Sequence, residues 1–296
     1  MTHHDTLTDD ELHALERDVL AALAAADPAR LTLLGEGEIS LVLAGGELGA
    51  WACKRLPPFA TSSAADRYAA TIERYLAVLS RRGVDVVDTT VRQLVGDDGR
   101  VVLYCVQPIL PADTLGVEVA RRDDELGRRL LERIVDVVLA SVDARFGLDA
   151  QLSNWALVGD RAVYVDVTTP LLRDAAGRTE LDTDVFLASL PWILRPVVRR
   201  FVVPGIIDRY HDPRVVLLDL AANLLKERLD HLVPVVVAAS EGRISPALAE
   251  AEIRRDRRSD ALTWGALQAV RRIDRAWQRH VRHRPYPFLI PTHRHT

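Results

Sequence analysis

The sequence contains few of the residues that build covalent cross-links or membrane-spanning structure. It has two cysteines, Cys53 and Cys105, among 296 residues, and both lie in apolar segments. Two such cysteines cannot form a disulfide framework, so we expect buried, reduced thiols. No run of about eighteen apolar residues occurs, and the polar N-terminus lacks the apolar core of a signal peptide. The sequence therefore predicts no transmembrane helix and a cytoplasmic location.

An excess of positive charge is also missing. The formal net charge is −4 at pH 7, whereas a general nucleic-acid-binding protein needs a basic surface. We therefore expect no nucleic-acid partner. Charged residues make up 27% of the chain and hydrophobic residues 48%, as in ordinary soluble globular proteins. The length is sufficient for one large domain or for two lobes around a sizeable core.

The first third of the chain predicts a β-rich region with one main helix. Acidic residues at 9–11 mark the start of an N-terminal helix, and an apolar face with helical spacing over residues 64–82 marks the main helix. Alternation of apolar and polar residues between turn signals marks the strands. The expected strands cover residues 31–35, 38–44, 50–56, 89–95 and 101–106.

The rest of the chain is predicted to be mostly helical. Residues 107–116 form an extended connector, a long helix follows over residues 119–145, and a short hairpin follows over residues 155–165. The expected fold class is therefore α+β. The expected division is a β-rich lobe at residues 1–108 and a helical lobe at residues 109–296.

A glycine-rich segment, GEGEISLV at residues 35–42, has two interpretations. Its spacing is G-x-G-x-x-S-x-V, and glycines allow a backbone to approach phosphate groups closely. The same segment is also typical of a tight turn between two strands. Taken alone it does not decide between a phosphate-binding loop and a turn.

Five further polar residues follow in an order that suits phosphoryl transfer. That reaction needs a lysine for the nucleotide phosphates, acids for Mg²⁺ and an acid for the acceptor hydroxyl. Lys54 lies in the strand segment WACK, and Glu73 lies on the helix after it. Asp149 and Asn154 form the pattern D-x-x-x-x-N, and Asp166 ends the apolar strand AVYVD.

The loop, the strand lysine, the helix glutamate and the later acids occur in the order in which protein kinases carry them, and the chain resembles the protein-kinase-like superfamily. The resemblance implies a bilobal fold that binds ATP and Mg²⁺ between a β-rich N-lobe and a helical C-lobe. It implies that Gly35 and Gly37 cover the ATP phosphates. It also implies that Val42 and Ala52 cover the adenine, and that residues 107–110 form the hinge.

The resemblance further assigns the chemical roles. Lys54 contacts the α and β phosphates of the nucleotide and is held by an ion pair with Glu73. Asp149 is the catalytic base, which takes up or orients the hydrogen of the acceptor hydroxyl. Asn154 and Asp166 bind Mg²⁺.

Three features depart from the kinase pattern, which is readable over residues 31–170. The third loop position is Ser40, which small-molecule kinases of this fold tolerate, so Ser40 stays in the nucleotide site. The triplet GLD at residues 147–149 lacks the histidine that braces the catalytic loop, and DVT at residues 166–168 replaces DFG. No APE motif follows. The pattern therefore looks closest to small-molecule kinases of the aminoglycoside-phosphotransferase type, and it leaves catalytic competence open.

Each of these residues also has a structural interpretation. Lys54 fits a strand lysine that extends its ammonium to the surface, and Glu73 fits a solvated helix residue. Asp149 and Asn154 fit a turn, because the segment FGLDAQLS is turn-like. Asp166 is harder to explain in this way, because a charge at the end of a buried strand costs free energy unless it is paired or metal-bound.

The C-terminal segment at residues 264–288 is rich in arginine and predicts an amphipathic helix. One interpretation is a helix docked on the core with a solvated basic face. The other is a surface that faces anions, such as a phosphorylated acceptor, an acidic peptide or anionic lipid headgroups. Histidines near the two ends of the chain lack the spacing of a metal site.

The sequence therefore predicts an ATP- and Mg²⁺-dependent phosphotransferase that acts on a hydroxyl of a small molecule or peptide. The altered triplets favour an alternative, a pseudokinase scaffold that binds a nucleotide or a protein partner without phosphoryl transfer. Two further alternatives are a kinase-like subunit that modifies a peptide together with a partner protein, and an enzyme held at an anionic membrane surface by the basic helix. The acceptor is not identified.

Overall fold

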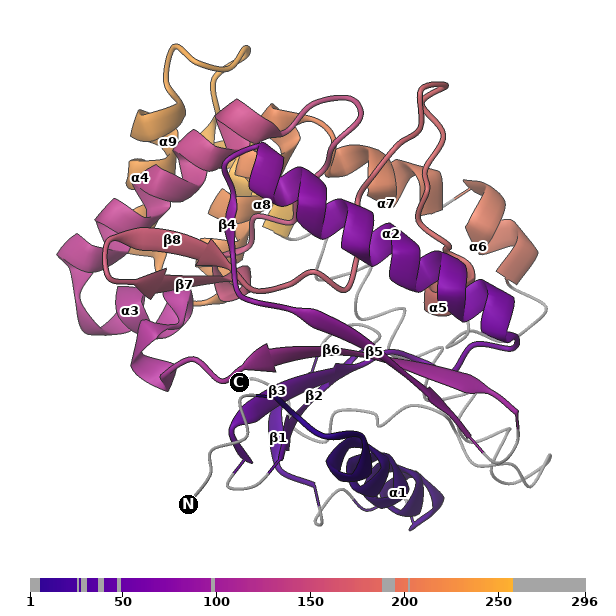
Figure 1. Ribbon diagram of the computed structural model, residues 1–296. Helices are drawn as coiled ribbons and strands as arrows, with labels where there is room; N and C mark the ends of the chain where they lie inside the picture. The colour runs from indigo at the N-terminus through magenta and orange to yellow at the C-terminus, as the bar shows by residue number, and fades with distance from the viewer. Residues whose placement is uncertain are drawn as a thin grey trace.

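The computed structural model describes residues 6–25, 27, 31–36, 40–46, 49–96, 99–187, 195–201 and 203–257. Within them, a β-sheet region from the first part of the chain packs against a mostly helical region from the rest (Figure 1). This arrangement confirms the α+β class. No helix in the described part is both long enough and apolar enough to cross a membrane.

A five-stranded sheet with the order β1-β2-β3-β6-β5 forms the first region. Every neighbouring pair in it is antiparallel, as short turn-linked strands predict. The chain leaves β2 through Gly46, whose φ of 78° is a conformation that glycine adopts without strain. The bounds are β1 Leu33–Glu36, β2 Leu41–Gly45, β3 Trp51–Arg55, β5 Thr90–Val95 and β6 Val101–Pro108.

The two faces of this sheet are buried by different helices. Along β6, Leu103 and Cys105 belong to the main core, whereas Tyr104 and Val106 belong to a second cluster. Alternate residues of a strand point to opposite faces, so the two clusters lie on opposite sides of the sheet. Figure 1 shows α1 on one side of the sheet and α2 on the other. Cys53 and Cys105 are both buried free thiols, as expected.

Helix α1, Asp9–Ala25, is held on the outer face by a buried ion pair. The Glu16 carboxylate accepts two hydrogen bonds from the Arg55 guanidinium, each 2.7 Å long, and a third from the Tyr104 hydroxyl. Buried charges are tolerated when they are paired in such a two-pronged geometry and fully hydrogen-bonded. The pair therefore fixes α1 to the centre of the sheet.

Helix α2, Ser62–Arg81, is the predicted main helix and packs on the inner face. It begins after Thr61, whose side chain accepts a hydrogen bond from the backbone N–H of Ala64. It ends before Gly83, whose φ of 75° is typical of the residue that terminates a helix. Its buried residues follow helical spacing and are Ala65, Tyr68, Ala69, Thr71, Ile72, Tyr75 and Leu79.

A second sheet of three strands joins distant parts of the chain. The predicted hairpin is present as β7, Trp155–Val158, and β8, Arg161–Tyr164. The strand β4, Asp85–Val86, pairs with β8 in parallel and was not predicted. Because β4 precedes residue 108 and β8 follows it, this sheet crosses the proposed lobe boundary. The division at residue 108 stays a prediction.

The single long helix predicted over residues 119–145 is wrong, because the structure has two helices there. They are α3, Gly116–Arg122, and α4, Asp124–Ser141. Asp123 between them is extended, and its carboxylate accepts hydrogen bonds from the backbone N–H groups of Glu125 and Leu126, both 3.0 Å long. This cap satisfies the free N–H groups at the start of α4 and so starts a new helix.

The remaining helices complete the second region and share one core with α2. Buried residues of α2, β6, α4, β8, α8 and α9 form a single continuous apolar cluster. The bounds are α5 Asp184–Leu187, α6 Arg195–Phe201, α7 Val203–Arg209, α8 Pro213–Lys226 and α9 Val233–Ser240, with short 3₁₀ turns at Ala112–Thr114, Leu152–Asn154 and Asp230–Leu232. The basic segment at residues 264–288 lies outside the described residues.

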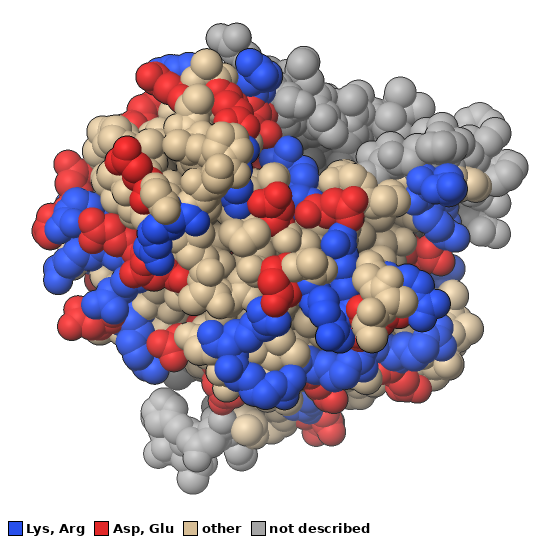
Figure 2. Space-filling view, turned by 90° about the horizontal axis from the view of Figure 1, so that it is seen from above, with Lys and Arg blue, Asp and Glu red and all other residues tan. Residues whose placement is uncertain are grey.

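Charged side chains of both signs are interspersed on the face shown in Figure 2. Some surface ion pairs join distant segments: Arg74 of α2 pairs with Glu180, and Arg82 pairs with Asp143 at 2.8 Å. Exposed pairs of this kind stabilise a fold only slightly. The burial of α2 against the shared core therefore contributes more to its position.

Candidate active site

Lys54 lies in the middle of the five-stranded sheet and is directed into the interface between the two regions. It pairs in register with Val42 of β2 and Cys105 of β6. Only 10% of its side-chain surface is exposed, and its ammonium donates a hydrogen bond to the carbonyl oxygen of Val165. The same ammonium lies 3.7 Å from Oδ1 of Asp166. Lys54 therefore does not extend to the surface.

Asp166 follows β8 and has a definite set of partners. Besides Lys54, its Oδ1 accepts a hydrogen bond of 2.8 Å from the Thr168 hydroxyl and one of 3.3 Å from the Thr168 backbone N–H. Its side chain is 31% exposed, so part of the carboxylate remains accessible. Pairing with Lys54 offsets the cost of placing this charge at a strand end.

Asp149 and Asn154 lie in the segment before β7, and a backbone hydrogen bond joins this segment to the residue before Asp166. The Asp149 Oδ1 accepts a hydrogen bond of 3.2 Å from the backbone N–H of Gln151, and the Asn154 side-chain amide donates one of 3.3 Å to the Asp149 carbonyl. The backbone N–H of Val165 donates to the Asn154 carbonyl at 2.9 Å. The structure therefore brings together four predicted residues, Lys54, Asp149, Asn154 and Asp166.

Gln107 joins the end of β6 to the segment before Asp166. Its side-chain amide donates a hydrogen bond of 3.0 Å to the Val165 carbonyl and one of 2.9 Å to the Thr89 hydroxyl. The Val165 carbonyl thus accepts from both Lys54 and Gln107. This junction fixes the connector predicted as the hinge against the carboxylate segment.

The predicted ion pair between Lys54 and Glu73 is wrong. Glu73 is exposed on α2, and it forms no ion pair with any residue that the structure describes. The reason is helical geometry: Glu73 follows the buried Ile72 by one residue, which turns it about 100° away from the buried face. Asp166 takes the place of Glu73 as the acidic partner of Lys54.

Two tyrosines connect α2 to the site instead. The Tyr68 hydroxyl donates a hydrogen bond of 2.9 Å to the carbonyl of Thr168, and the Tyr75 hydroxyl donates one of 3.0 Å to the carbonyl of Gly147. Burial raises the pKa of both tyrosines above the ordinary value, and the Asp166 carboxylate adds to the rise. Both hydroxyls therefore stay protonated and act as donors to the two loops.

A histidine packs against the segment that leads to Asp149, although none lies in the triplet that ends at Asp149. His211, between α7 and α8, is 5% exposed, and its Nδ1 lies 3.0 Å from the Ile207 carbonyl oxygen. A Cβ added at Gly147 would lie 3.0 Å from the His211 ring and 2.9 Å from the Tyr210 carbonyl oxygen. The missing side chain at Gly147 therefore makes room for a ring from another part of the chain. No motif around His211 marks this role in the sequence.

The residues predicted to cover the nucleotide are only partly described. Val42 and Ala52 lie on the same face of the sheet as Lys54, because Val42 pairs with Lys54 and Ala52 precedes it by two residues. Ser40 is buried. Gly35 lies in β1, where an added Cβ would meet only Val42 at 3.8 Å, so the protein's own packing does not demand a glycine there. Gly37 lies outside the described residues.

The donor set fits Mg²⁺ bound together with a nucleotide. Within the described residues no group of three or more histidine, cysteine or acidic side chains is close enough to hold a metal by itself. Mg²⁺ is usually bound by one or two carboxylates, water and substrate phosphates. Asp166 supplies a partly exposed carboxylate. The Asn154 amide nitrogen donates to Asp149, so the amide oxygen remains for a cation.

The order and placement of these parts define the class of the protein. An antiparallel sheet carries a central lysine, one helix packs on its inner face, and a helical region supplies the D-x-x-x-x-N loop and a strand-end aspartate beside the lysine. This is a protein-kinase-like fold.

The chain belongs to a family of unknown function, DUF6206, which matches residues 14–275. No curated protein matches it. Among solved structures, "WaaP in complex with acyl carrier protein" is 16% identical with a TM-score of 0.32, over 77% of this chain and 98% of that chain. The "MAP kinase LmaMPK10 from Leishmania major" is 12% identical with a TM-score of 0.33, over 81% of this chain and 90% of that chain. The family description assigns no activity.

Proposed function

We propose that this protein is an ATP- and Mg²⁺-dependent phosphotransferase that acts on a hydroxyl group. One observation carries the proposal. Lys54 contacts Asp166, Asn154 donates to the Asp149 carbonyl, and the backbone N–H of Val165, next to Asp166, donates to the Asn154 carbonyl, which supports a shared site for these four residues. A cation for phosphate, oxygen ligands for Mg²⁺ and a separate carboxylate for the acceptor are the parts that phosphoryl transfer needs.

In the proposed reaction, the bond between the γ-phosphorus of ATP and the oxygen that leaves with ADP breaks. A new bond forms between that phosphorus and the acceptor oxygen. Asp149 takes the hydrogen of the acceptor hydroxyl and later releases it to water. Asp149 suits this role because it is half-exposed and the Gln151 N–H, which donates a hydrogen bond to its Oδ1, orients the carboxylate.

Lys54 and Asp166 act on the nucleotide side. Lys54 donates hydrogen bonds to phosphate oxygens, and Asp166 with Asn154 holds Mg²⁺. When bound, Mg²⁺ neutralises the charge that develops on the phosphoryl oxygens. Tyr68 and Tyr75 orient the two loops that carry Asp166 and Asp149, because they donate to Thr168 and Gly147.

We infer that the acceptor belongs to a small molecule or a peptide, as in kinases of the aminoglycoside-phosphotransferase type. The absence of an APE motif from the sequence supports this branch over protein kinases. The assignment of ATP, Mg²⁺ and this acceptor class rests on the geometry above and on the resemblance of the motifs.

Calorimetry of ATP binding with and without Mg²⁺ tests the proposal. Wild type is expected to bind ATP in a Mg²⁺-dependent way, and Asp166→Asn is expected to lose that dependence. The control is Glu241→Gln, which changes an exposed acid after α9 with no ion pair in the described part of the chain. Equal Mg²⁺-dependent binding by wild type and Asp166→Asn would contradict the metal assignment.

A second candidate function is a pseudokinase scaffold. The observations that favour it are the direct contact between Lys54 and Asp166 and the exposed position of Glu73 on α2, since active protein kinases hold the lysine with the helix glutamate. Such a protein would bind ATP or a partner protein without transfer. Release of ADP that is strictly dependent on Asp149, measured with Asp149→Asn as the comparison, would exclude it.

A further inference from the structure

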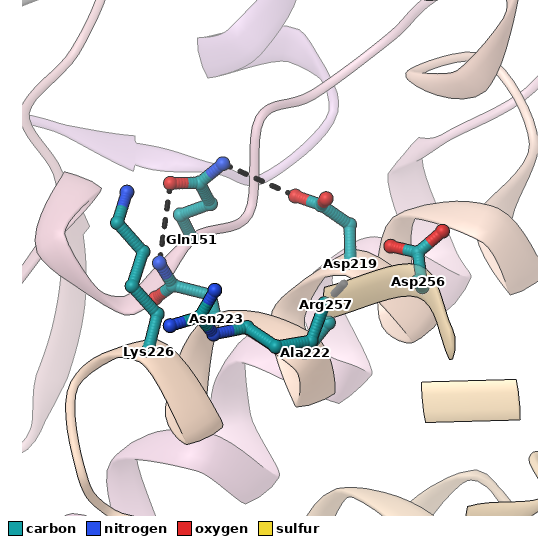
Figure 3. A pocket seen from close by; sticks show the side chains of 7 residues that line it. All are labelled: Gln151, Asp219, Ala222, Asn223, Lys226, Asp256 and Arg257. Carbon is teal, nitrogen blue, oxygen red and sulfur yellow. Dashed lines mark hydrogen bonds between the residues drawn. The ribbon is translucent and has the colours of Figure 1, made fainter. Parts of the chain in front are cut away.

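A polar pocket lies next to the catalytic loop, between Gln151 and helix α8 (Figure 3). Its enclosed volume is about 10 Å³, which is room for one water-sized group. The pocket therefore suits a single functional group of a larger molecule. Its walls are Gln151, Asp219, Ala222, Asn223, Lys226, Asp256 and Arg257.

The hydrogen bonds in this pocket leave one acceptor without a donor. The Gln151 amide nitrogen donates to the Asp219 carboxylate at 3.2 Å, so the Gln151 oxygen must be the atom on the other side. That oxygen accepts a hydrogen bond of 3.3 Å from the Asn223 amide nitrogen. The orientation of both amides is thus fixed by Asp219. The Asn223 Oδ1 is buried and has no hydrogen-bond partner, and the whole residue is only 6% exposed.

The two carboxylates of the pocket are already neutralised. Arg209 of α7 contacts Asp256 with hydrogen bonds of 2.9 and 3.0 Å and lies 3.6 Å from Asp219. One guanidinium therefore serves both acids. Among the described residues, Arg209, Lys226 and Arg257 give three cations against the two carboxylates, an excess of one positive charge.

Lys226 and Arg257 supply the excess positive charge of the pocket. Neither forms a hydrogen bond or an ion pair with any residue in the described part of the chain. Figure 3 shows the Lys226 side chain running beside Asn223, and the Arg257 side chain reaching back toward the same amide. Lys226 and Lys54 are also the only two lysines in the sequence. A compact ammonium and a guanidinium thus flank the unpartnered acceptor.

We propose that this pocket is a binding subsite for a small hydroxylated anion, either a hydroxy-carboxylate or a phosphorylated polyol. Lys226 and Arg257 bind the carboxylate or phosphate. The Asn223 Oδ1 accepts a hydrogen bond from a hydroxyl of the same molecule. Both interactions satisfy groups that have no partner within the part of the chain that the structure describes.

The subsite connects directly to the proposed catalytic carboxylate. The Gln151 side chain lines the pocket, and its backbone N–H donates to Asp149 Oδ1 at 3.2 Å. An acceptor held by its anionic group at Lys226 would present a neighbouring hydroxyl toward Asp149. This acceptor role rests on the proposed phosphotransferase function, whereas binding of the anion does not.

The presence of only two lysines permits a selective binding experiment. Wild-type protein labelled with ¹³C at the lysine Cε should give two side-chain NMR signals, which Lys226→Arg assigns. Glycerate and inorganic phosphate are expected to shift the Lys226 signal in a saturable manner at constant ionic strength. Neutral glycerol is the control and should leave it unchanged. Absence of a saturable shift with both anions would overturn the proposal.

A pair of variants on the same helical segment tests the geometry. Arg257→Met should weaken glycerate binding about tenfold, which is about 1.4 kcal/mol, because it removes a hydrogen bond between a cation and the anion. Arg255→Met is the matched control: Arg255 is exposed, does not line the pocket, and should leave binding within about twofold. Equal weakening of glycerate binding in both variants would overturn the proposal, because it would show that the anion is attracted by the general positive charge of this segment.

The same spectra separate this proposal from the function it extends. MgATP should shift the Lys54 signal, and glycerate should not. A response of Lys226 to glycerate with no response of Lys54 to MgATP would support the anion subsite and overturn its role as an acceptor site. A response of Lys54 alone would support nucleotide binding and overturn the subsite.

Discussion

The ammonium nitrogen of Lys54 lies 3.7 Å from Oδ1 of Asp166, so the strand lysine and the strand-end aspartate are direct partners. The two residues are far apart in the sequence and come from the two regions of the fold. Their contact holds β3 against the segment after β8. It also places a mostly buried ammonium beside a partly exposed carboxylate.

This contact predicts unequal effects of two substitutions on stability. Asp166→Ala leaves the mostly buried Lys54 ammonium without its carboxylate. Removing one partner of a fully buried pair costs about 3–5 kcal/mol, and the 31% exposure of Asp166 reduces this to about 1–2 kcal/mol. Lys54→Met removes the charge but keeps the apolar stem, so the free energy of unfolding should change by less than about 1 kcal/mol. Urea titration measures both values.

Nucleotide binding should be lost in both of these variants. Calorimetry under the same conditions therefore separates the effect on the site from the effect on the fold. A Lys54→Met protein that is less stable than Asp166→Ala would contradict the pairing described here.

The tyrosines of α2 should matter more than its glutamate. Tyr75→Phe removes the donor to the buried Gly147 carbonyl and should lower the free energy of unfolding by about 1–3 kcal/mol. Glu73→Gln changes an exposed side chain and should stay within about 0.5 kcal/mol of wild type, with unchanged ATP affinity. A marked loss of ATP affinity in Glu73→Gln would instead support the ion pair between Lys54 and Glu73 that the sequence predicts.

His211 should make stability depend on pH in the weakly acidic range. Burial lowers its pKa below the ordinary value of 6.5, and the positive charge of Arg173 acts in the same direction, although the Ile207 carbonyl opposes it. The unfolded chain therefore binds a proton at a higher pH than the folded chain does. The stability that the folded chain gains from a neutral His211 is fully present above about pH 6.5. It is lost as the pH falls from there through the pKa of His211 in the folded chain.

Thermal unfolding of wild type and His211→Gln between about pH 5 and 8 tests this expectation. The difference in melting temperature between the two proteins should shrink toward the acidic end. A constant difference over the whole range would show that protonation of His211 does not contribute.

The buried ion pair under α1 predicts a large effect far from the proposed active site. Glu16→Ala leaves the Arg55 guanidinium buried without its carboxylate, since only 3% of the Arg55 side chain is exposed. The free energy of unfolding should fall by about 3–5 kcal/mol. The double variant Glu16→Met with Arg55→Met should recover most of this loss. Denaturant titration measures the free energy of unfolding of the single and double variants. A loss in the double variant equal to the sum of the two single losses would contradict a coupled ion pair.

Much of the sheet region could be predicted from the sequence, because its signals are local. Alternating strands, glycine turns and the helical spacing of α2 all act over a few residues, and the structure confirms them. The helix break at Asp123 had a local signal too, since an aspartate followed by acidic residues is typical of a helix start. The two-residue strand β4 is too short to produce any pattern, and only pairing with β8 creates it.

In the candidate site, too, the residues with local motifs could be predicted and the contacts made by distant segments could not. Lys54, Asp149, Asn154 and Asp166 carry motifs, and the structure brings them together. Glu73 follows Ile72 on α2 and is exposed, whereas the kinase pattern pairs it with Lys54.

His211 had no signal in the sequence. Its ring reaches Gly147 only because the connection between α7 and α8 passes the catalytic loop in the folded chain. Nothing local to the residues around His211 indicates that contact.

Strand β3 carries two consecutive cations whose side chains lie on opposite faces of the sheet. Lys54 faces the proposed active site and contacts Asp166, whereas Arg55 faces outward and contacts Glu16 of α1. The two ion pairs share one peptide bond, so β3 cannot slide or tilt without altering both. The N-terminal helix and Lys54 are therefore coupled through a single strand, and a displacement of α1 would be transmitted to Lys54 through β3.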